Sequence, residues 1–293
     1  MNNKVVIMGA GGFLGSSLCH YLEEKKYIVL KQGRGEDAEY TVNPNNIIET
    51  RNFLSSMQPD CIVNLIGLTN VDYCENYPHE AYLINAKIVE NISLIINEMT
   101  IKPHFIHIST DHVYDSSECN KEDRVNLTNY YAYSKYIGEL AAMKAQSTIL
   151  RTNFFGLSRS LGRISFTDWI FNSLKDQSQI KVFKDVIFSP LYIQTLIEMI
   201  ELCIRMQPTG IYNLGSCNSI SKSDFAFLFA SELRLKHNLM QSVFINDVKV
   251  QRAYRPKGMA MDVERFETAL GVRMPEICDQ IQRAAQEYRA YIT

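Results

Sequence analysis

The fold of this 293-residue chain is decided by its opening stretch, Lys4-Val-Val-Ile-Met8-Gly9-Ala-Gly-Gly12-Phe-Leu-Gly15. The apolar run predicts a β-strand over residues 4–8. Apolar residues spaced i, i+4, i+7 and i+8 then predict a helix, with Leu14, Leu18, Tyr21 and Leu22 on one face. Glycines between a strand and a helix allow a tight turn and a close backbone approach to a pyrophosphate, which the positive helix end attracts. The spacing here is Gly-x-x-Gly-x-x-Gly.

Strand-length apolar runs recur along the first two-thirds of the chain, with helical segments between them. We predict strands at 27–30, 61–65, 104–109, 148–151 and 210–214, and helices at 81–99, 131–145, around Trp169, at 191–206 and from about 275. Strands separated by helices predict right-handed crossovers and a parallel sheet covered on both faces. We therefore predict an α/β fold, a Rossmann-type doubly wound sheet formed by 1–155 and 186–215, with a smaller interleaved substrate-binding lobe formed by 156–185 and 216–293.

Composition argues against several functional classes. The net charge is −2, and the 30 basic and 32 acidic residues are dispersed, which argues against nucleic-acid binding. No apolar run approaches the roughly 18 residues that span a bilayer, and a strand at residue 4 leaves no room for a signal peptide. The seven scattered cysteines form no Cys-x-x-Cys, as expected of reduced thiols in a cytoplasmic protein. His104 and His107 should point to opposite faces of their strand, so we expect no metal site.

The sequence Tyr131-Ala-Tyr-Ser-Lys135 carries the clearest chemical signal. Residues four apart share one face of a helix, so the lysine ammonium can lie near the phenol. A nearby cation favours the ionised phenol and lowers its pKa from the usual value of about 10. Tyr131 is therefore a candidate acid/base group at neutral pH.

A hydroxyl partner for Tyr131 is predicted in Ser109-Thr110-Asp111-His112-Val113-Tyr114, which follows the fourth strand. Ligands bind outside the carboxyl ends of strands in open sheets. With the glycine motif and Tyr131-x-x-x-Lys135, this order of motifs resembles the extended short-chain dehydrogenases/reductases. The resemblance implies that Thr110 is the hydroxyl of a catalytic triad, that Tyr131 is its acid/base, and that Lys135 binds the nicotinamide ribose and tunes Tyr131.

Further segments are similar to the dTDP-4-dehydrorhamnose reductase family. They include Asn64-Leu-Ile-Gly-Leu-Thr69-Asn-Val-Asp72-Tyr-Cys-Glu75, Ile84-Asn85-Ala86, Leu150-Arg-Thr-Asn153, Ser189-Pro-Leu-Tyr192, Gly210-Ile-Tyr-Asn-Leu-Gly215 and Arg255-Pro256. The resemblance implies NAD(P)H-dependent reduction of the 4-keto group of a nucleotide-diphospho-4-keto-6-deoxyhexose in deoxysugar biosynthesis. A homodimer is common in the superfamily.

The nicotinamide cofactor is expected to contact the glycine turn and two further loops. The expected residues are Gly9, Gly12, Phe13, Leu14, Gly15, Arg34, Asn64, Leu65, Ile66 and Gly67, together with Tyr131 and Lys135. The end of the second strand carries no carboxylate for a ribose 2′-hydroxyl, whereas Lys31 and Arg34 are cationic, which favours NADPH over NADH. Alternatively, both cations are only exposed loop charges. Leu65 and Ile66 replace the family's small Ala-Ala and should narrow the nicotinamide pocket.

The substrate is expected to contact Thr69, Asp111, His112, Asn153, Trp169, Arg252 and Arg255. A sugar can stack on Trp169, and arginines can pair with a diphosphate. The alternatives are core packing for Trp169 and surface ion pairs for the arginines. Helix capping explains Asp72 and Glu75 adequately.

Two rivals stay open at this stage, whereas a third function, water elimination, is argued against by the sequence. Sugar-nucleotide 4,6-dehydratases place Asp-Glu after the catalytic threonine, but here His112 follows Asp111, which argues against water elimination. An epimerase or an epimerase-reductase would use the same triad. A non-catalytic NADP-binding regulatory subunit, like that of methionine adenosyltransferase, is a rival of another class.

Overall fold

The computed structural model describes residues 4–35, 38–160, 162–248 and 253–291. Its centre is a six-stranded sheet in the order β10-β5-β4-β3-β1-β2, with every neighbouring pair parallel. The strands are β1 (Lys4–Met8), β2 (Ile28–Gln32), β3 (Cys61–Asn64), β4 (His104–Thr110), β5 (Ser147–Thr152) and β10 (Gly210–Leu214). The predicted doubly wound parallel sheet is therefore confirmed.

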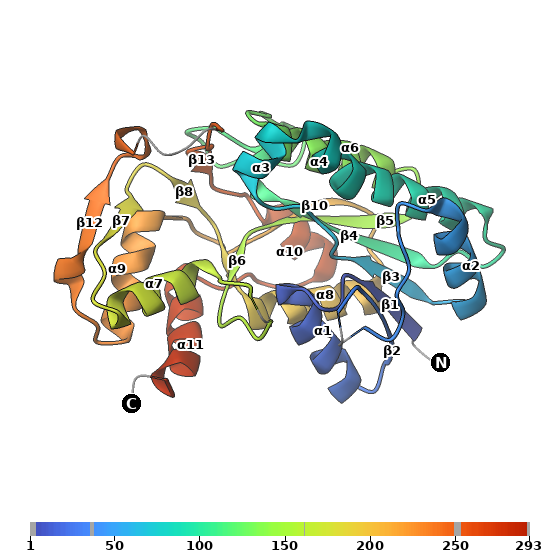
Figure 1. Cartoon of the computed structure of the whole chain (residues 1–293), viewed down its shortest axis with the longest axis horizontal. Helices are drawn as coiled ribbons and strands as arrows, with labels where there is room; N and C mark the ends of the chain where they lie inside the picture. Colours follow the sequence, from blue (N-terminus) through green and yellow to red (C-terminus); the bar gives the residue numbers. More distant parts are fainter. Residues whose placement is uncertain (1–3, 36–37, 161, 249–252, 292–293) are drawn as a thin grey trace.

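Helices cover both faces of this sheet (Figure 1). One face carries α2 (Ile47–Met57), α5 (Ile88–Glu98) and α6 (Tyr130–Ala142), and the other carries α1 (Phe13–Glu24) and α8 (Ile193–Met206). Each layer has its own apolar core, one formed with α1 and α8 and the other with α2 and α5. Parallel strands are buried on both sides by such layers, which explains their nearly continuous apolar sequences.

Two parts of this layer differ from the prediction. The segment predicted as one helix over 81–99 consists of α4 (Pro78–Tyr82), a π-helical turn over Leu83–Lys87 and then α5. An apolar pattern cannot distinguish a π-turn from the α-helix that contains it. The helix α2 was not predicted, although Asn46 caps it by accepting hydrogen bonds from the backbone N–H groups of Ile48 and Glu49.

The second lobe is built from short strands and three longer helices, at the left of Figure 1. The lobe contains two small sheets. One pairs β12 (Met240–Val243) with β7 (Ile180–Phe183). The other has the strand order β11 (Ile220–Ser221), β8 (Ile187–Phe188), β13 (Gly258–Met259). The helices are α7 (Phe166–Lys175), α9 (Lys222–Glu232) and α11 (Ile277–Arg289). The remaining elements are α3 (Val71–Asn76), β6 (Phe154–Phe155), β9 (Leu191–Tyr192), α10 (Glu264–Leu270) and short 3-10 turns at Asp111–Val113, His237–Leu239 and Ile245–Asp247.

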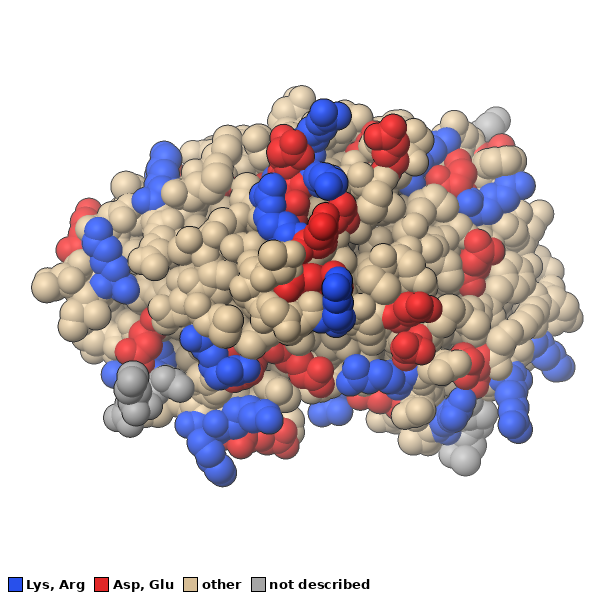
Figure 2. All heavy atoms as spheres, turned by 180° about the vertical axis from the view of Figure 1, so that it is seen from behind, with Lys and Arg blue, Asp and Glu red and all other residues tan. Residues whose placement is uncertain are grey.

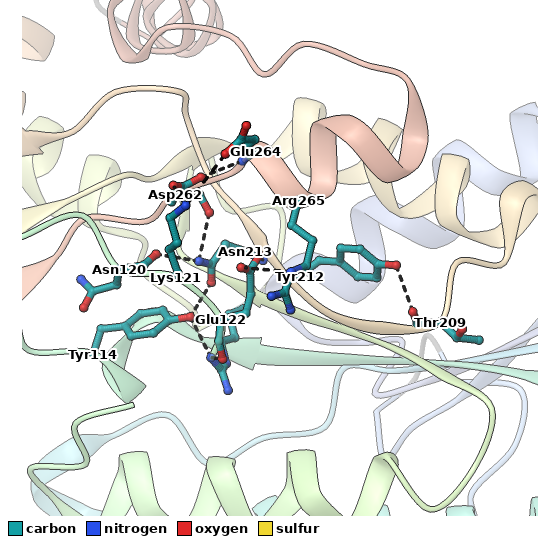
Figure 3. Close-up of polar contacts among 11 residues, drawn as sticks. Tyr114, Asn120, Lys121, Glu122, Thr209, Tyr212, Asn213, Asp262, Glu264 and Arg265 are labelled. Carbon is teal, nitrogen blue, oxygen red and sulfur yellow. Dashed lines mark hydrogen bonds and ion pairs between the residues drawn. The ribbon is translucent and has the colours of Figure 1, made fainter. Parts of the chain in front are cut away.

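A polar network joins the segment 262–265 to the central sheet (Figure 3). The Asn213 side chain on β10 accepts a hydrogen bond from the Tyr114 hydroxyl at 2.7 Å and donates to the carbonyls of Asn120 and Asp262 at 2.9 and 3.0 Å. The Arg265 guanidinium lies 3.5 Å from the Glu122 carboxylate, which itself accepts from the Asn213 backbone N–H. These contacts fix the loop after β4 against the lobe.

The surface carries charges of both signs. On the face drawn in Figure 2, acidic and basic side chains alternate, and neither sign covers a large continuous area. Within the described ranges, no helix combines the length and the hydrophobicity needed to cross a bilayer. All seven cysteines are free, and Cys119, Cys217 and Cys278 are exposed.

Candidate active site

The glycine turn after β1 has a shape that side chains would destroy. Gly9 has a φ of +88°, and a Cβ on Gly15 would lie 2.3 Å from the Gly9 carbonyl oxygen. Gly12 precedes α1 and no side chain caps the helix, so its first backbone N–H groups stay available to a ligand. Because helix N-termini attract anions, this cradle fits the pyrophosphate of a dinucleotide.

The 64–67 loop lies against this turn at the β1–β3 boundary, where the strand order reverses. A Cβ on Gly9 would meet the Ile66 side chain at 3.2 Å. Asn64 stabilises the loop by accepting a hydrogen bond from the Ile66 N–H at 3.2 Å, and its amide contacts the His107 ring, also at 3.2 Å. Such a reversal is where nucleotides bind in doubly wound sheets.

Three predicted cofactor residues, Phe13, Leu14 and Leu65, have side chains that lie in the apolar core or pack against it. The Leu14 side chain is buried in the core, so only its backbone can face a cofactor. Phe13 packs against Phe154 with ring centroids 5.4 Å apart, and Leu65 packs against the same core. A glycine pattern predicts the turn, but it does not predict where the neighbouring side chains point.

The end of β2 carries an amide and two cations. Gln32 is buried, and its side chain accepts a hydrogen bond from the Gly9 N–H at 3.2 Å. The Lys31 ammonium pairs with Glu23 at 2.6 Å. Arg34 is exposed, and within the described part of the chain it forms no ion pair.

Thr110, Tyr131 and Lys135 are brought together from β4 and α6. Thr110 lies close enough to Tyr131 to lower the pKa of the phenol, and the Thr110 hydroxyl donates to the Asp111 carboxylate at 3.3 Å. The Lys135 ammonium donates to the Ile108 carbonyl at 2.6 Å, and a Cβ on Gly67 would lie 3.9 Å from that ammonium. The three predicted catalytic groups therefore lie together at the carboxyl end of β4, with Lys135 close to Gly67 of the 64–67 loop.

Burial dominates the electrostatics of these groups. Burial raises the pKa of Tyr131, and the Asp111 carboxylate raises it further, although the Thr110 hydroxyl lowers it. The prediction of a lowered Tyr131 pKa is therefore wrong, because desolvation by burial disfavours the ionised phenol and is the largest influence on its pKa. Burial also lowers the pKa of Lys135 to about 8, against the opposing effect of Glu139. Tyr131 is thus a protonated phenol near neutral pH, which suits a proton donor.

The π-helical turn supplies a residue that sequence analysis noted only for its similarity. The Asn85 side chain accepts from the Leu68 N–H at 2.7 Å and donates to the Leu68 carbonyl and the Ser134 hydroxyl. It therefore ties the 67–68 loop to α6. Gly138 permits the close approach of α6 to the backbone of the π-turn, since a Cβ there would lie 2.3 Å from the Asn85 carbonyl oxygen.

Asp111, His112 and Asn153 gather beside Tyr131. The Asn153 amide donates to the Asp111 carboxylate at 2.8 Å, and burial raises the pKa of Asp111 to about 6. The His112 ring lies edge-on to Tyr131, with centroids 5.3 Å apart, and burial lowers the pKa of His112 to about 3. His112 is therefore neutral near pH 7, and its buried Nδ1 has no hydrogen-bond partner among the described residues.

The remaining predicted substrate residues have mixed positions. Arg255 pairs with Asp72 at 2.8 Å, so Asp72 does more than begin a helix. Trp169 is 37% exposed and stacks on Phe166 at 5.9 Å, which excludes full core burial. Thr69 is exposed on the loop before α3. Arg252 lies outside the described residues.

Sequence analysis missed Lys222, the first residue of α9. Its ammonium interacts electrostatically with Asp111, His112 and Arg255, and it lies 5.8 and 5.7 Å from the ring centroids of Phe166 and Phe188. The only local signal was a capped helix start at Ser221-Lys222-Ser-Asp224, which says nothing of a distant partner.

Comparison with known proteins gives a consistent result. A family model described as RmlD substrate binding domain matches residues 3–290. The spore coat polysaccharide biosynthesis protein SpsK of Bacillus subtilis is 29% identical over 241 residues, covering 80% of each chain. The dTDP-4-dehydrorhamnose reductase of Escherichia coli is 26% identical over 259 residues, covering 84% of each chain.

A solved structure shares the fold over nearly the whole length. The dTDP-4-dehydrorhamnose reductase of Bacillus anthracis, in complex with NADP, superposes with a TM-score of 0.87 at 24% identity, covering 98% of this chain and 100% of that one. The fold of the chain is therefore the same as that of this solved structure.

Proposed function

The chain belongs to the RmlD substrate binding domain family, and from that premise we propose that it reduces the 4-keto group of a nucleotide-diphospho-4-keto-6-deoxyhexose with NADPH. The reaction would be a step of deoxysugar and polysaccharide biosynthesis, as the names of its relatives suggest. The observation that carries the proposal is that Thr110 of β4 lies beside Tyr131 of α6, one helical turn before the buried Lys135. The nucleoside carried by the sugar is proposed to be thymidine, by analogy with the Escherichia coli relative.

The residues of the chain fit the proton transfer of this reaction. When bound, the cofactor supplies a hydride to C4 of the sugar. Tyr131 donates its proton to the oxygen that becomes a hydroxyl, and Thr110 supports that oxygen by a hydrogen bond. The raised pKa of Tyr131 keeps the proton available until negative charge develops on the substrate. Lys135 then favours the tyrosinate that remains, and it is close enough to Gly67 to hold the nicotinamide ribose there.

The choice of NADPH rests on the end of β2. Gln32 occupies a position where a carboxylate would bind a ribose 2′-hydroxyl, and its side chain is engaged with the glycine turn and the Val42 carbonyl. Arg34 is exposed nearby. An arginine there accommodates a 2′-phosphate, whereas an acidic residue would repel it.

The cellular setting and the division of labour are also proposals. Residues 1–155 and 186–215 would bind the cofactor, and 156–185 and 216–293 the sugar nucleotide. Seven free cysteines suit a reducing cytoplasm. A homodimer is proposed by analogy with the superfamily.

The test is NADPH oxidation with dTDP-, GDP-, CDP- and UDP-linked 4-keto-6-deoxyhexoses offered separately, with Tyr131→Phe as the control. We expect turnover with the dTDP-linked sugar and its loss in the control. Absence of turnover with all four sugars, despite NADPH binding, would overturn the proposal and favour an epimerase or a regulatory subunit. Undiminished turnover in Tyr131→Phe would overturn the role of the tyrosine.

A further inference from the structure

Lys222 reaches the proposed site from the second lobe. It follows β11, and its backbone N–H donates to the Val186 carbonyl at 2.9 Å, which fixes the start of α9 beside β8. Asp111, by contrast, follows β4 of the central sheet. Each of the two lowers the cost of charging the other, since Lys222 lowers the pKa of Asp111 and Asp111 raises that of Lys222. The pair therefore bridges the two halves of the molecule next to Thr110 and Tyr131.

Apart from its electrostatic interaction with Asp111, the Lys222 ammonium has no polar partner among the described residues. Burial lowers the pKa of Lys222, and no ion pair or side-chain hydrogen bond involves it among the described residues. Its closest described neighbours include the rings of Phe166 and Phe188, at 5.8 and 5.7 Å. Arg255, the other cation of this region, is instead matched by Asp72 at 2.8 Å. Lys222 is half-buried, and its ammonium, with no hydrogen-bond partner among the described residues, can donate to a ligand that brings acceptor oxygens.

We propose that Lys222, together with Asp111, binds the hydroxyl groups of the hexose ring next to the carbonyl and so selects and orients the sugar rather than the nucleotide. This inference rests on the proposed function. Lys222 offers donors and Asp111 offers acceptor oxygens, and a hydroxyl can both donate and accept. Two neighbouring hydroxyls can therefore be bound by the pair at once.

The surroundings favour a sugar over a phosphate at this position. The Asp111 carboxylate would repel a phosphate placed between it and the ammonium. The half-buried Phe166, with the exposed Trp169 stacked on it and the buried Phe188 ring edge-on to it, gives an aromatic surface against which the apolar face of a sugar can pack. The Asn153 amide and the Thr110 hydroxyl both donate to the Asp111 carboxylate and hold it in place.

The experiment compares the affinity for a sugar nucleotide with that for the nucleotide alone. Calorimetric titrations with dTDP-rhamnose and with dTDP would be run on the wild type, Lys222→Met and Lys222→Arg, each saturated with NADP. Lys181→Met is the matched control, since Lys181 is exposed on β7. Circular dichroism would verify that every variant is folded, which we expect because Lys222 anchors no described side chain.

We expect Lys222→Met to weaken dTDP-rhamnose binding by about 10- to 100-fold, the range for a lost hydrogen bond to a charged group, with dTDP binding unchanged. Lys222→Arg should retain part of the affinity and Lys181→Met all of it. An equal loss for dTDP would place Lys222 on the diphosphate and overturn the inference, as would unchanged binding of both ligands or a wild type that binds dTDP-rhamnose no more tightly than dTDP. These readouts need no turnover, so they stay separate from a failure of the wild type to oxidise NADPH, which would overturn the proposed function instead.

Discussion

Two charged pairs of this protein, Arg151–Glu139 and Lys222–Asp111, differ in how completely hydrogen bonds satisfy their charged groups. The Arg151–Glu139 pair joins β5 to α6 at 2.6 Å, is almost fully buried, and is surrounded by further hydrogen bonds. Ser109 donates to Glu139 at 2.5 Å, and Arg151 donates to the Tyr114 hydroxyl and the Glu122 carbonyl. In the Lys222–Asp111 pair, Asp111 is buried and Lys222 half-buried, and the lysine side chain makes no hydrogen bond to a described residue.

We infer from this difference that Arg151 and Glu139 stabilise the fold, whereas Lys222 binds a ligand. A buried ion pair is tolerable when hydrogen bonds satisfy its remaining donors and acceptors. Arg151 and Glu139 meet that condition, so removal of one partner should affect stability first. Lys222 does not meet it, so its removal should affect binding and leave the fold intact. Each prediction below tests one side of this contrast.

The largest effect is expected at Lys135, a buried cation on the functional side. Lys135→Met should reduce turnover by about 10²- to 10⁴-fold, the usual worth of an acid/base group, because Tyr131 loses the charge that stabilises its anion. The free energy of unfolding should stay close to that of the wild type, since burial already disfavours the ammonium, whose pKa is about 8. Steady-state assays and urea denaturation would measure both. A Lys135→Met variant with a much lower free energy of unfolding but undiminished turnover would mean that Lys135 serves the fold rather than the reaction.

The second effect is expected in the structural pair. Arg151→Met should lower the free energy of unfolding by about 3–5 kcal/mol, because it leaves the Glu139 carboxylate buried without its partner. The double variant Arg151→Met with Glu139→Leu should recover much of that loss, since no charge then remains. Urea denaturation of the wild type, both single variants and the double variant gives the coupling energy. Additive losses, without recovery, would show that the pair does not act as a unit.

A smaller and pH-dependent effect is expected at Asp111. The folded-state pKa of about 6 exceeds the unfolded value of 3.8, so the stabilisation from this carboxyl is complete below pH 3.8 and is lost as the pH rises through 6. Asp111→Asn should therefore be more stable than the wild type above pH 6, by about 3 kcal/mol, while sugar binding weakens. The stability gain should vanish below pH 3.8. Denaturation curves at pH 4 and pH 7.5 would check this, and a gain that is larger at pH 4 would contradict it.

The smallest effect is expected at Arg34, an exposed cation outside both pairs. Arg34→Ala should raise the KM for NADPH by about tenfold, or 1.4 kcal/mol, and leave the KM for NADH unchanged, because only NADPH carries the 2′-phosphate. Lys31→Ala is the matched control, since the Lys31 ammonium is engaged with Glu23. An equal rise for both cofactors would mean that Arg34 does not read the 2′-phosphate.

The local parts of this site could be predicted from the sequence, and the distant parts could not. The glycine turn and Tyr131-x-x-x-Lys135 are short patterns whose geometry follows from one turn and one helix, and both lie where they were expected. The electrostatic consequence was wrong for Tyr131, because its pKa depends on burial by the whole fold. Lys222 escaped prediction for the same reason. It lies 111 positions from Asp111 in the sequence, and no local pattern indicates that the lobe brings the two together.

The parallel sheet was predicted because its buried strands are apolar throughout, whereas the π-turn and α2 were not. Asn85 looked like an ordinary helix position, yet the π-turn directs its side chain onto Leu68. The sequence of α2 mixes polar and apolar residues, and its apolar pattern is weak: Ile47-Ile-Glu-Thr-Arg-Asn-Phe-Leu-Ser-Ser-Met57. Its helix is specified mainly by the Asn46 cap and by packing of Phe53 and Leu54 under β2.

The most direct test of the whole account is transfer of a label from the cofactor to the sugar. NADPH deuterated at the transferable position would be incubated with the enzyme and dTDP-4-keto-6-deoxyhexose, and the product examined by NMR spectroscopy. We predict one deuterium at C4 of the product sugar, one NADPH oxidised per sugar reduced, and loss of both in Tyr131→Phe. A product without deuterium at C4, or a sugar altered with no net oxidation of NADPH, would contradict the assignment of this chain as a 4-keto sugar nucleotide reductase.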